Sequence, residues 1–147
     1  MPDPAAAFAL TPIGTIRSAL ARPEDAPRQG SEGAPDAWVE VDAAVAEGLD
    51  GLAPGDDIVL ITWLHRAARD VLKVHPRGDE RNPLTGVFAT RSPARPNPLG
   101  LHRVRVIAID AGRLHVAPLE AIDGTPVVDI KPVLGSPSVD EEPEPAA

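Results

Sequence analysis

The sequence has 147 residues, a formal net charge of −8 and no cysteine. This length suits one domain with its own core, and the lack of cysteine excludes disulfides and thiolate metal sites. No apolar run approaches the roughly 20 residues that a membrane helix requires, and Asp3 stands where a signal peptide would carry basic residues. We therefore expect a cytoplasmic protein with no membrane partner.

The charges are distributed unevenly along the chain. Residues 1–57 hold 11 acidic and 3 basic side chains, whereas residues 58–105 hold 9 basic and 3 acidic ones. The net negative charge argues against a general nucleic-acid binder, and we expect no DNA partner. The basic segment predicts local anion binding. A solvated surface that faces acidic neighbours is the alternative explanation.

Eighteen prolines and twelve glycines predict many short elements joined by rigid turns. In chain order, we expect strands over residues 8–17, 37–41, 58–64, 86–90, 101–109, 114–119 and 127–130. One or two helical turns are expected over 43–49, and a short helix is possible within 66–74. The proline-rich residues 92–100 exclude both a helix and a central strand.

Short strands between turn signals favour a mainly β fold, a single small β-barrel with short helical segments over residues 1–135. No GxGxxG motif follows a strand, so a nucleotide-like ligand would not be bound as in a Rossmann fold. The acidic, proline-rich residues 136–147 predict a disordered tail.

The most unusual stretch is GVFATRSPARPNPLGL, residues 86–101. Its three prolines fix the backbone before any ligand arrives. Arg91 and Arg95 offer guanidinium groups to a carboxylate or phosphate, Asn97 offers a donor and an acceptor, and Gly100 permits close backbone approach. A rigid connector between two strands explains the same residues equally well.

A second stretch, DGTPVVDIKP, covers residues 123–132. Asp129 and Lys131 lie on one face of its predicted strand, either as a surface ion pair, which is slightly favoured, or as a pair in a site. His65 directly follows a buried strand, where side chains often line the mouth of a barrel. His65 and His75 lack the spacing of metal ligands, so no metal is expected.

Together these stretches resemble the TrmO/TsaA-like family. GVFATRSPARPNPLGL and DGTPVVDIKP are similar to its two signatures, and PIGTIRS at 12–18 and WLHRAARDVLKVHPRGD at 63–79 also fit. The resemblance spans about residues 8–135. It implies a β-barrel homodimer that uses S-adenosylmethionine to methylate N6-threonylcarbamoyladenosine beside the anticodon of threonine tRNA. Many relatives carry a further C-terminal domain, and an aromatic residue where this sequence has Val133.

The resemblance also assigns roles to residues. The cofactor is expected to contact Arg91, Ser92, Arg95, Asn97, Leu99, Gly100, Leu101, Asp123, Thr125 and Lys131. Asp129 or His65 would take the proton from the nucleophile, and Arg103 and Arg105 would meet tRNA phosphates. Two other functions stay open: a small-molecule methyltransferase on the same barrel, and a non-catalytic module that binds the cofactor.

Overall fold

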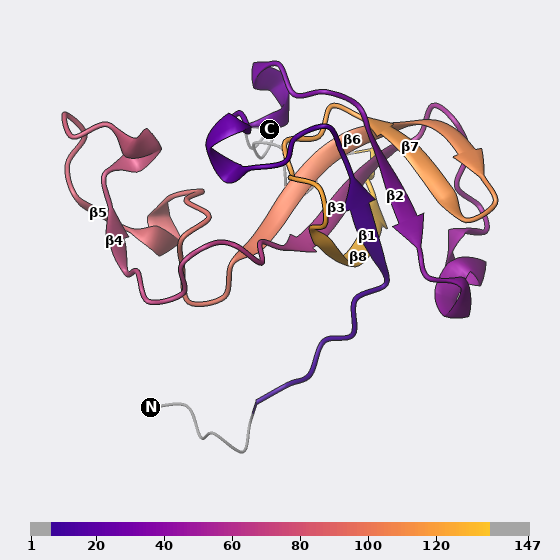
Figure 1. The fold of residues 1–147 in the computed structure, drawn as a ribbon, viewed down its shortest axis with the longest axis horizontal. Helices are drawn as coiled ribbons and strands as arrows, with labels where there is room; N and C mark the ends of the chain where they lie inside the picture. Colours follow the sequence, from indigo (N-terminus) through magenta and orange to yellow (C-terminus); the bar gives the residue numbers. More distant parts are fainter. Residues whose placement is uncertain (1–6, 136–147) are drawn as a thin grey trace, which may run out of the picture.

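The structure is a computed structural model, and it describes residues 7–135. In this part of the chain, six strands form a closed antiparallel barrel in the order β1-β2-β7-β6-β3-β8 (Figure 1). The strands are β1 (Gly14–Arg17), β2 (Ala37–Val41), β3 (Asp57–Trp63), β6 (Leu99–Asp110), β7 (Arg113–Ala117) and β8 (Pro126–Pro132). The expected mainly β barrel is therefore confirmed. The tail expected over residues 136–147 lies outside the described residues.

Residues 64–98, which we call the arm, leave the barrel after β3 and return at β6. The arm contains the two-stranded sheet of β4 (Lys73–Val74) and β5 (Thr85–Gly86), with the 3₁₀ turns η5 (Pro76–Gly78) and η6 (Val87–Ala89). It projects to one side of the barrel (Figure 1). Trp63 pairs with Leu99 across β3 and β6, so both ends of the arm start from one point of the sheet.

The other helical turns described are also 3₁₀ segments. They are η2 (Pro23–Asp25), η3 (Gly30–Glu32) and η4 (Ala43–Leu49). Asp42 begins η4, because its side chain accepts a hydrogen bond from the backbone N–H of Ala44 at 3.1 Å. The helical turns expected over residues 43–49 are thus confirmed, and η2 and η3 lie between the barrel and the arm (Figure 1).

The core is formed by every second residue of the strands, because successive side chains point to opposite faces of a sheet. In β6, for example, Val104 and Val106 are buried, whereas Arg105 and Ile107 are exposed. The core cluster consists of Ile16, Ala37, Val39, Ile58, Leu60, Val104, Val106, Leu114, Val116, Leu119, Ala121 and Val127. The barrel interior is therefore filled by aliphatic side chains, as the scarcity of aromatic residues requires.

Four expectations about local structure are wrong. The strand expected over residues 8–17 begins only at Gly14, since Pro12 has no N–H to donate to a neighbouring strand. Of the strand expected over residues 86–90, only Gly86 belongs to β5: the chain turns into η6 at Val87, where the Thr90 N–H donates back to the Val87 carbonyl. Residues 66–72 form turns and bends instead of a helix. The barrel strand β6 begins at Leu99, inside the stretch expected to exclude a central strand, because Leu99 pairs with Trp63 directly after Pro98.

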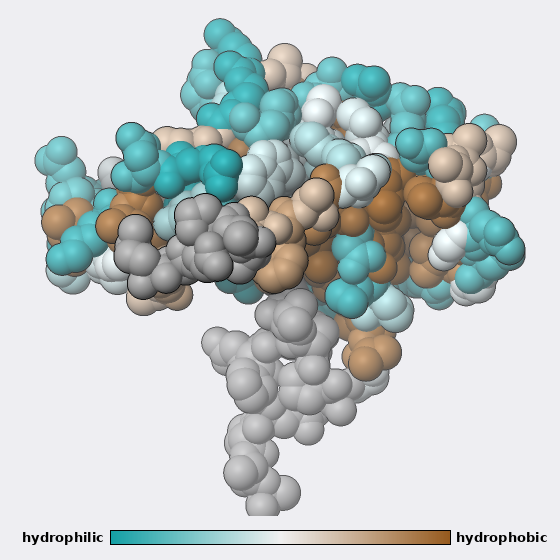
Figure 2. All heavy atoms as spheres, turned by 90° about the horizontal axis from the view of Figure 1, so that it is seen from below, coloured by the Kyte–Doolittle hydropathy of each residue, from teal (hydrophilic) through white to brown (hydrophobic). Residues whose placement is uncertain are grey.

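Apolar residues remain on the surface despite this core. Figure 2 shows the molecule from below, with apolar residues gathered across the barrel half of this face. On the arm, the side chains of Leu72, Leu84 and Phe88 are exposed, with Phe88 at 81%. The homodimer expected from the family resemblance stays a prediction.

Replacing Gly14 tests the register of β1 against β2. A Cβ on Gly14 would lie 2.5 Å from the carbonyl oxygen of Glu40, so the two strands must move apart. We expect Gly14→Ala to lower the free energy of unfolding in urea by about 1–3 kcal/mol. Gly48→Ala is the control, since its Cβ would meet no atom within 4 Å. Equal stability of Gly14→Ala and wild type would contradict this register.

Candidate functional site

A cleft of about 1280 Å³ lies between the arm and one end of the barrel. Its walls come from residues 23–32, the arm, the first residues of β6 and residues 120–125. The volume exceeds the roughly 300–1,000 Å³ that is common for small-molecule sites. The cleft exists because the arm leaves and rejoins the barrel at one point of the sheet, beside the loop that carries η2 and η3.

Three polar side chains form a hydrogen-bonded chain at the base of this cleft. Thr62 Oγ1 lies 2.6 Å from His102 Nε2, and His102 Nδ1 lies 2.5 Å from Glu120 Oε1. Thr62 is fully buried and His102 is 5% exposed, while Glu120 lines the cleft. Since a carboxylate only accepts hydrogen bonds, Nδ1 carries the imidazole proton and Nε2 accepts from the Thr62 hydroxyl. The chain therefore runs from the barrel interior to the cleft.

Gly100 makes room for this chain. It pairs with Thr62 across β3 and β6, and a Cβ at this position would lie 2.6 Å from both His102 Nε2 and Thr62 Oγ1. Its missing side chain thus allows the threonine and histidine to meet inside the barrel. We expected Gly100 to permit a close approach to the backbone, and the groups that lie close to it are the side chains of Thr62 and His102.

Arg95 holds the proline-rich loop together through hydrogen bonds to backbone carbonyls. Its Nε donates to the carbonyl of Ser92 at 2.8 Å, and its Nη2 donates to the carbonyls of Val87 and Thr90 at 2.7 and 2.6 Å. A planar guanidinium reaches three carbonyls because its donors point in fixed directions. Arg95 therefore holds η6 and the following loop in one conformation.

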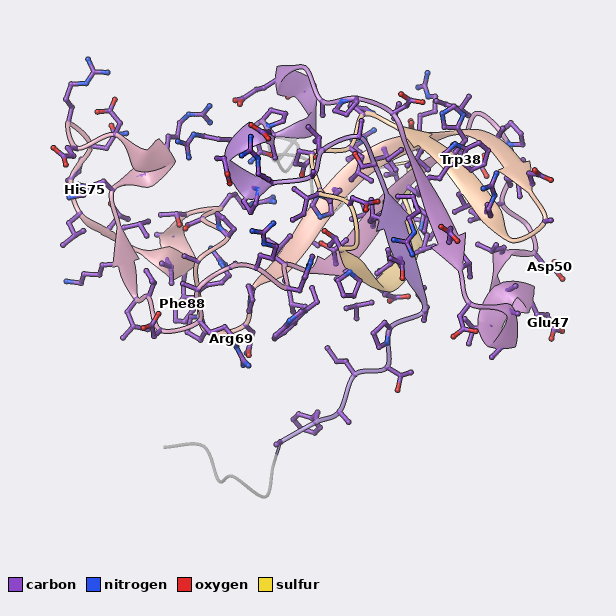
Figure 3. All side chains as sticks on the ribbon, viewed as in Figure 1. Trp38, Glu47, Asp50, Arg69, His75 and Phe88 are labelled. Carbon is purple, nitrogen blue, oxygen red and sulfur yellow. The ribbon has the colours of Figure 1, made fainter. Side chains whose placement is uncertain are left out.

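Arg69 holds the far end of the same loop. Its Nε donates to the carbonyl of Pro96 at 2.8 Å, and its Nη2 donates to Asn97 Oδ1 at 3.3 Å. Its guanidinium also lies over the ring of Trp63, 5.0 Å from the ring centre. Arg69 therefore connects the last residue of β3 to the proline-rich segment, on the arm side of the molecule (Figure 3).

Comparison with known proteins identifies the family. The model of the tRNA-methyltransferase O N-terminal domain matches residues 15–140. The chain belongs to this family. It is 42% identical over 129 residues to a probable S-adenosyl-L-methionine-binding protein of Pyrococcus horikoshii, covering 85% of this chain and 82% of that protein. An S-adenosyl-L-methionine-binding protein of Archaeoglobus fulgidus is 40% identical over 131 residues, covering 89% and 91%.

Solved structures have the same fold as this chain. Two crystal structures of TrmO from Pseudomonas aeruginosa match with TM-scores of 0.71 and 0.70, at 32% and 29% sequence identity. The matches cover 93% and 96% of this chain but only 60% and 66% of those proteins. This member of the tRNA-methyltransferase O family therefore spans about three-fifths to two-thirds of the length of these structures.

Most residues predicted from the family resemblance line the cleft. They are His65, Arg91, Ser92, Arg95, Leu99, Gly100, Leu101 and Thr125. Thr125 is buried, and its hydroxyl donates to the carbonyl of Ile122 at 2.7 Å. The structure thus brings the two signature segments to one cleft, whereas the contacts of each residue with a cofactor stay predictions.

Four predicted residues lie outside this lining: Asn97, Asp123, Asp129 and Lys131. Asp123 Oδ1 accepts a hydrogen bond from the backbone N–H of Ser18 at 3.1 Å. Asp129 Oδ2 lies 3.6 Å from Lys131 Nζ, with both side chains about half exposed. Such exposed pairs contribute little to stability. The surface ion pair expected as one alternative is therefore present on β8.

The predicted RNA-binding arginines lie on the outer face of β6, beside one acid. Arg105 Nε lies 3.2 Å from Asp57 Oδ1, and Arg103 Nη2 lies 3.9 Å from Asp57 Oδ2. Both arginines line a second, shallower hollow of about 590 Å³, which Glu120 and His102 also border. Asp57 therefore offsets part of the positive charge of this surface.

Ion pairs also fix charges on the arm. The Arg81 guanidinium donates to both oxygens of Asp79, which lowers the pKa of Asp79, and the same contact raises the pKa of Arg81. Across the cleft, Arg77 Nη2 donates to Glu32 Oε1 at 2.7 Å. Asp79 is thus held as an anion, and Arg77 connects the arm to η3.

Two classes of site are not seen within residues 7–135. No group of three or more His, Asp or Glu side chains in this range is placed to hold a metal ion. No helix in it has the length and apolar character needed to cross a bilayer.

Sequence reasoning missed His102 and Glu120. The sequence does contain a signal for His102. It is two and four residues before the inward-facing Val104 and Val106, so alternation places it on the core face of the strand. A histidine on the core face of a strand requires a polar partner. Nothing in the sequence indicates that Glu120, in the segment after β7, is this partner.

Arg95→Lys tests the structural role of this arginine. An ammonium cannot reach all three carbonyls in the geometry of the guanidinium, so we expect the free energy of unfolding to fall by about 1–3 kcal/mol. Amide exchange over residues 87–95 should become faster, as measured by mass spectrometry. Arg81→Lys, at an exposed position on the same arm, should leave exchange over 87–95 unchanged. Unaltered exchange in Arg95→Lys would show that the loop is rigid without the hydrogen bonds of the Arg95 guanidinium.

Proposed function

We propose that this chain is an S-adenosylmethionine-dependent methyltransferase that acts on tRNA, with the cleft as its cofactor site. Its family is named after a tRNA methyltransferase, and relatives at 40–42% identity are named S-adenosyl-L-methionine-binding proteins. The observation that carries the proposal is that the proline-rich segment and Thr125 line one cleft at the barrel end. A shared ligand site would account for this meeting of residues from both signatures.

The cleft residues fit the chemistry of this cofactor. S-adenosylmethionine carries a carboxylate, an ammonium, a sulfonium and an adenine ring. The lining offers the guanidinium of Arg91 for the carboxylate, carboxylates such as Glu24 for the cationic groups, and apolar side chains such as Leu99 and Ile122 for the ring. Arg91 is our candidate for the carboxylate, because it lines the cleft within the proline-rich signature segment.

Methyl transfer requires positioning more than covalent chemistry. The cofactor supplies a methyl group on a positively charged sulfur. The protein must align the nucleophile with that group, and alignment alone contributes up to ~7–11 kcal/mol to lowering the barrier. The proline-rich loop is suited to this task, because Arg95 and Arg69 bind it at both ends.

The proposed acceptor is N6-threonylcarbamoyladenosine beside the anticodon of threonine tRNA. Its urea-type nitrogen is a weak nucleophile and must lose a proton, so a nearby base accelerates the reaction by about 10²–10⁴-fold. Of the two candidates predicted from sequence, His65 lines the cleft. The other, Asp129, is paired with Lys131 outside the lining.

A small-molecule methyltransferase is the second candidate function. The net charge of −8 and the placement of Asp57 beside Arg103 and Arg105 both weaken attraction to RNA phosphates. Incubation with methyl-labelled S-adenosylmethionine and total tRNA, followed by nucleoside analysis, separates the two functions. Label in N6-threonylcarbamoyladenosine supports the tRNA function, whereas label only in a metabolite supports the alternative. Cofactor binding without transfer would indicate a non-catalytic module.

Arg91→Ala tests the cofactor site. We expect the affinity for S-adenosylmethionine to weaken by ~1.5–3 kcal/mol, the scale of a hydrogen bond to a charged group, as measured by calorimetry. Arg113→Ala is the control, because Arg113 lies over the ring of Trp38 and not in the cleft lining. Unchanged affinity in Arg91→Ala would remove this residue from the site.

Arg103→Ala and Arg105→Ala test the RNA surface. Each substitution should lower the affinity for tRNA and leave cofactor affinity unchanged. Binding of tRNA to wild type should also fall steeply with added salt, because each neutralised phosphate releases counterions. Filter binding over a series of salt concentrations measures both effects. Transfer to tRNA that responds neither to salt nor to these substitutions would place the RNA surface elsewhere.

A further inference from the structure

Glu120 presents one carboxylate oxygen at the base of the cleft. Its Oε1 is bound by His102 Nδ1 at 2.5 Å, and its side chain is 15% exposed. Within the described residues, Oε2 receives no hydrogen bond. A Cβ on Gly30 would lie 3.0 Å from Oε2, so this oxygen lies beside η3, and Glu120 borders both the cleft and the second hollow. One oxygen is thus fixed, and the other is available to a ligand.

The partners of Glu120 fix its orientation. His102 donates from Nδ1, and its Nε2 accepts from Thr62 inside the barrel. Thr62 is fully buried and does not line the cleft, so it acts on the cleft only through His102. The carboxylate of Glu120 is therefore held in place by a buried chain of two hydrogen bonds.

The other carboxylates of the lining are placed differently. Glu32 is bound to Arg77 at 2.7 Å, and the side chain of Glu24 is 64% exposed beside Arg22. Glu80 is exposed on the arm, and so is the imidazole of His65. A base at an exposed rim exchanges its proton with water before it meets the substrate. Among the described carboxylates of the cleft lining, Glu120 has the least exposed side chain.

We propose that Glu120 is the group that takes the proton from the substrate nitrogen, and that His102 and Thr62 are its positioning residues. This inference rests on the proposed methyl-transfer function. As the nitrogen forms its bond to the methyl carbon, its N–H proton passes to Glu120 Oε2. The sulfur keeps the electron pair of the broken bond and leaves as a neutral thioether. The proton is later released from Glu120 to water through the open cleft.

Glu120→Gln tests the proton acceptor, because glutamine keeps an oxygen for His102 but is not a base. We expect kcat for tRNA methylation to fall by about 100-fold or more. The KM for tRNA and the calorimetric affinity for S-adenosylmethionine should stay within about twofold of wild type. Glu47→Gln is the control, on η4 at the far side of the barrel from the arm (Figure 3). It should match wild type in all three measurements.

Thr62→Val tests the positioning role without touching the cleft surface. Loss of one neutral hydrogen bond should lower kcat by about 2- to 10-fold with unchanged KM. This variant also decides the matter if Glu120→Gln does not fold, as judged by its melting temperature. An unchanged kcat in Thr62→Val would then overturn the proposal.

Three further results would also overturn it. The first is full kcat in folded Glu120→Gln, and the second is loss of turnover in His65→Gln with Glu120→Gln still active. The third is a Glu120→Gln protein that binds S-adenosylmethionine weakly but binds its neutral thioether product normally, which would make Glu120 a contact of the sulfonium. A wild-type protein that never methylates tRNA removes the proposed function itself, and this proton transfer with it.

Discussion

The pairing of Thr62 with Gly100 across β3 and β6 is the contact on which the cleft depends. At this one level of the barrel, a position without a side chain lets a buried hydroxyl reach a buried imidazole. The imidazole then extends the polar chain to Glu120 at the cleft. Buried polar groups are costly unless they are bonded, so the three residues must be satisfied together.

The same pair of strands also determines where the arm lies. Trp63 and Leu99 form the neighbouring pair, so the arm leaves and returns one residue away from the polar chain. Arg69 bonds the proline-rich loop near this point, and Arg95 bonds the loop internally. Two guanidinium groups and three prolines therefore give the cleft a wall that is rigid before any ligand arrives, which lowers the entropic cost of binding.

Sequence reasoning succeeded where one local rule decides the structure. Alternation along residues 101–109 and the turn signals between short strands predicted strands and a barrel, because packing follows the same period. It failed where tertiary contacts decide: residues 87–89 look like part of a strand but form the turn η6, whose Val87 carbonyl accepts a hydrogen bond from Arg95. Arg95 looked like a ligand group, yet three backbone carbonyls take its donors. Glu120 was missed because it lies in a segment without regular structure and its partner His102 is 18 residues away, on β6.

Hydrogen exchange with and without S-adenosylmethionine tests most directly whether the cleft between arm and barrel is the ligand site. The cleft account predicts slower exchange on cofactor addition, confined to residues 23–32, 64–67, 74–80, 88–102 and 120–125, the segments that line the cleft. Protection centred instead on the opposite barrel face, where Trp38 stacks on His115, would contradict it. No change in exchange at any residue under a saturating cofactor concentration would contradict it equally.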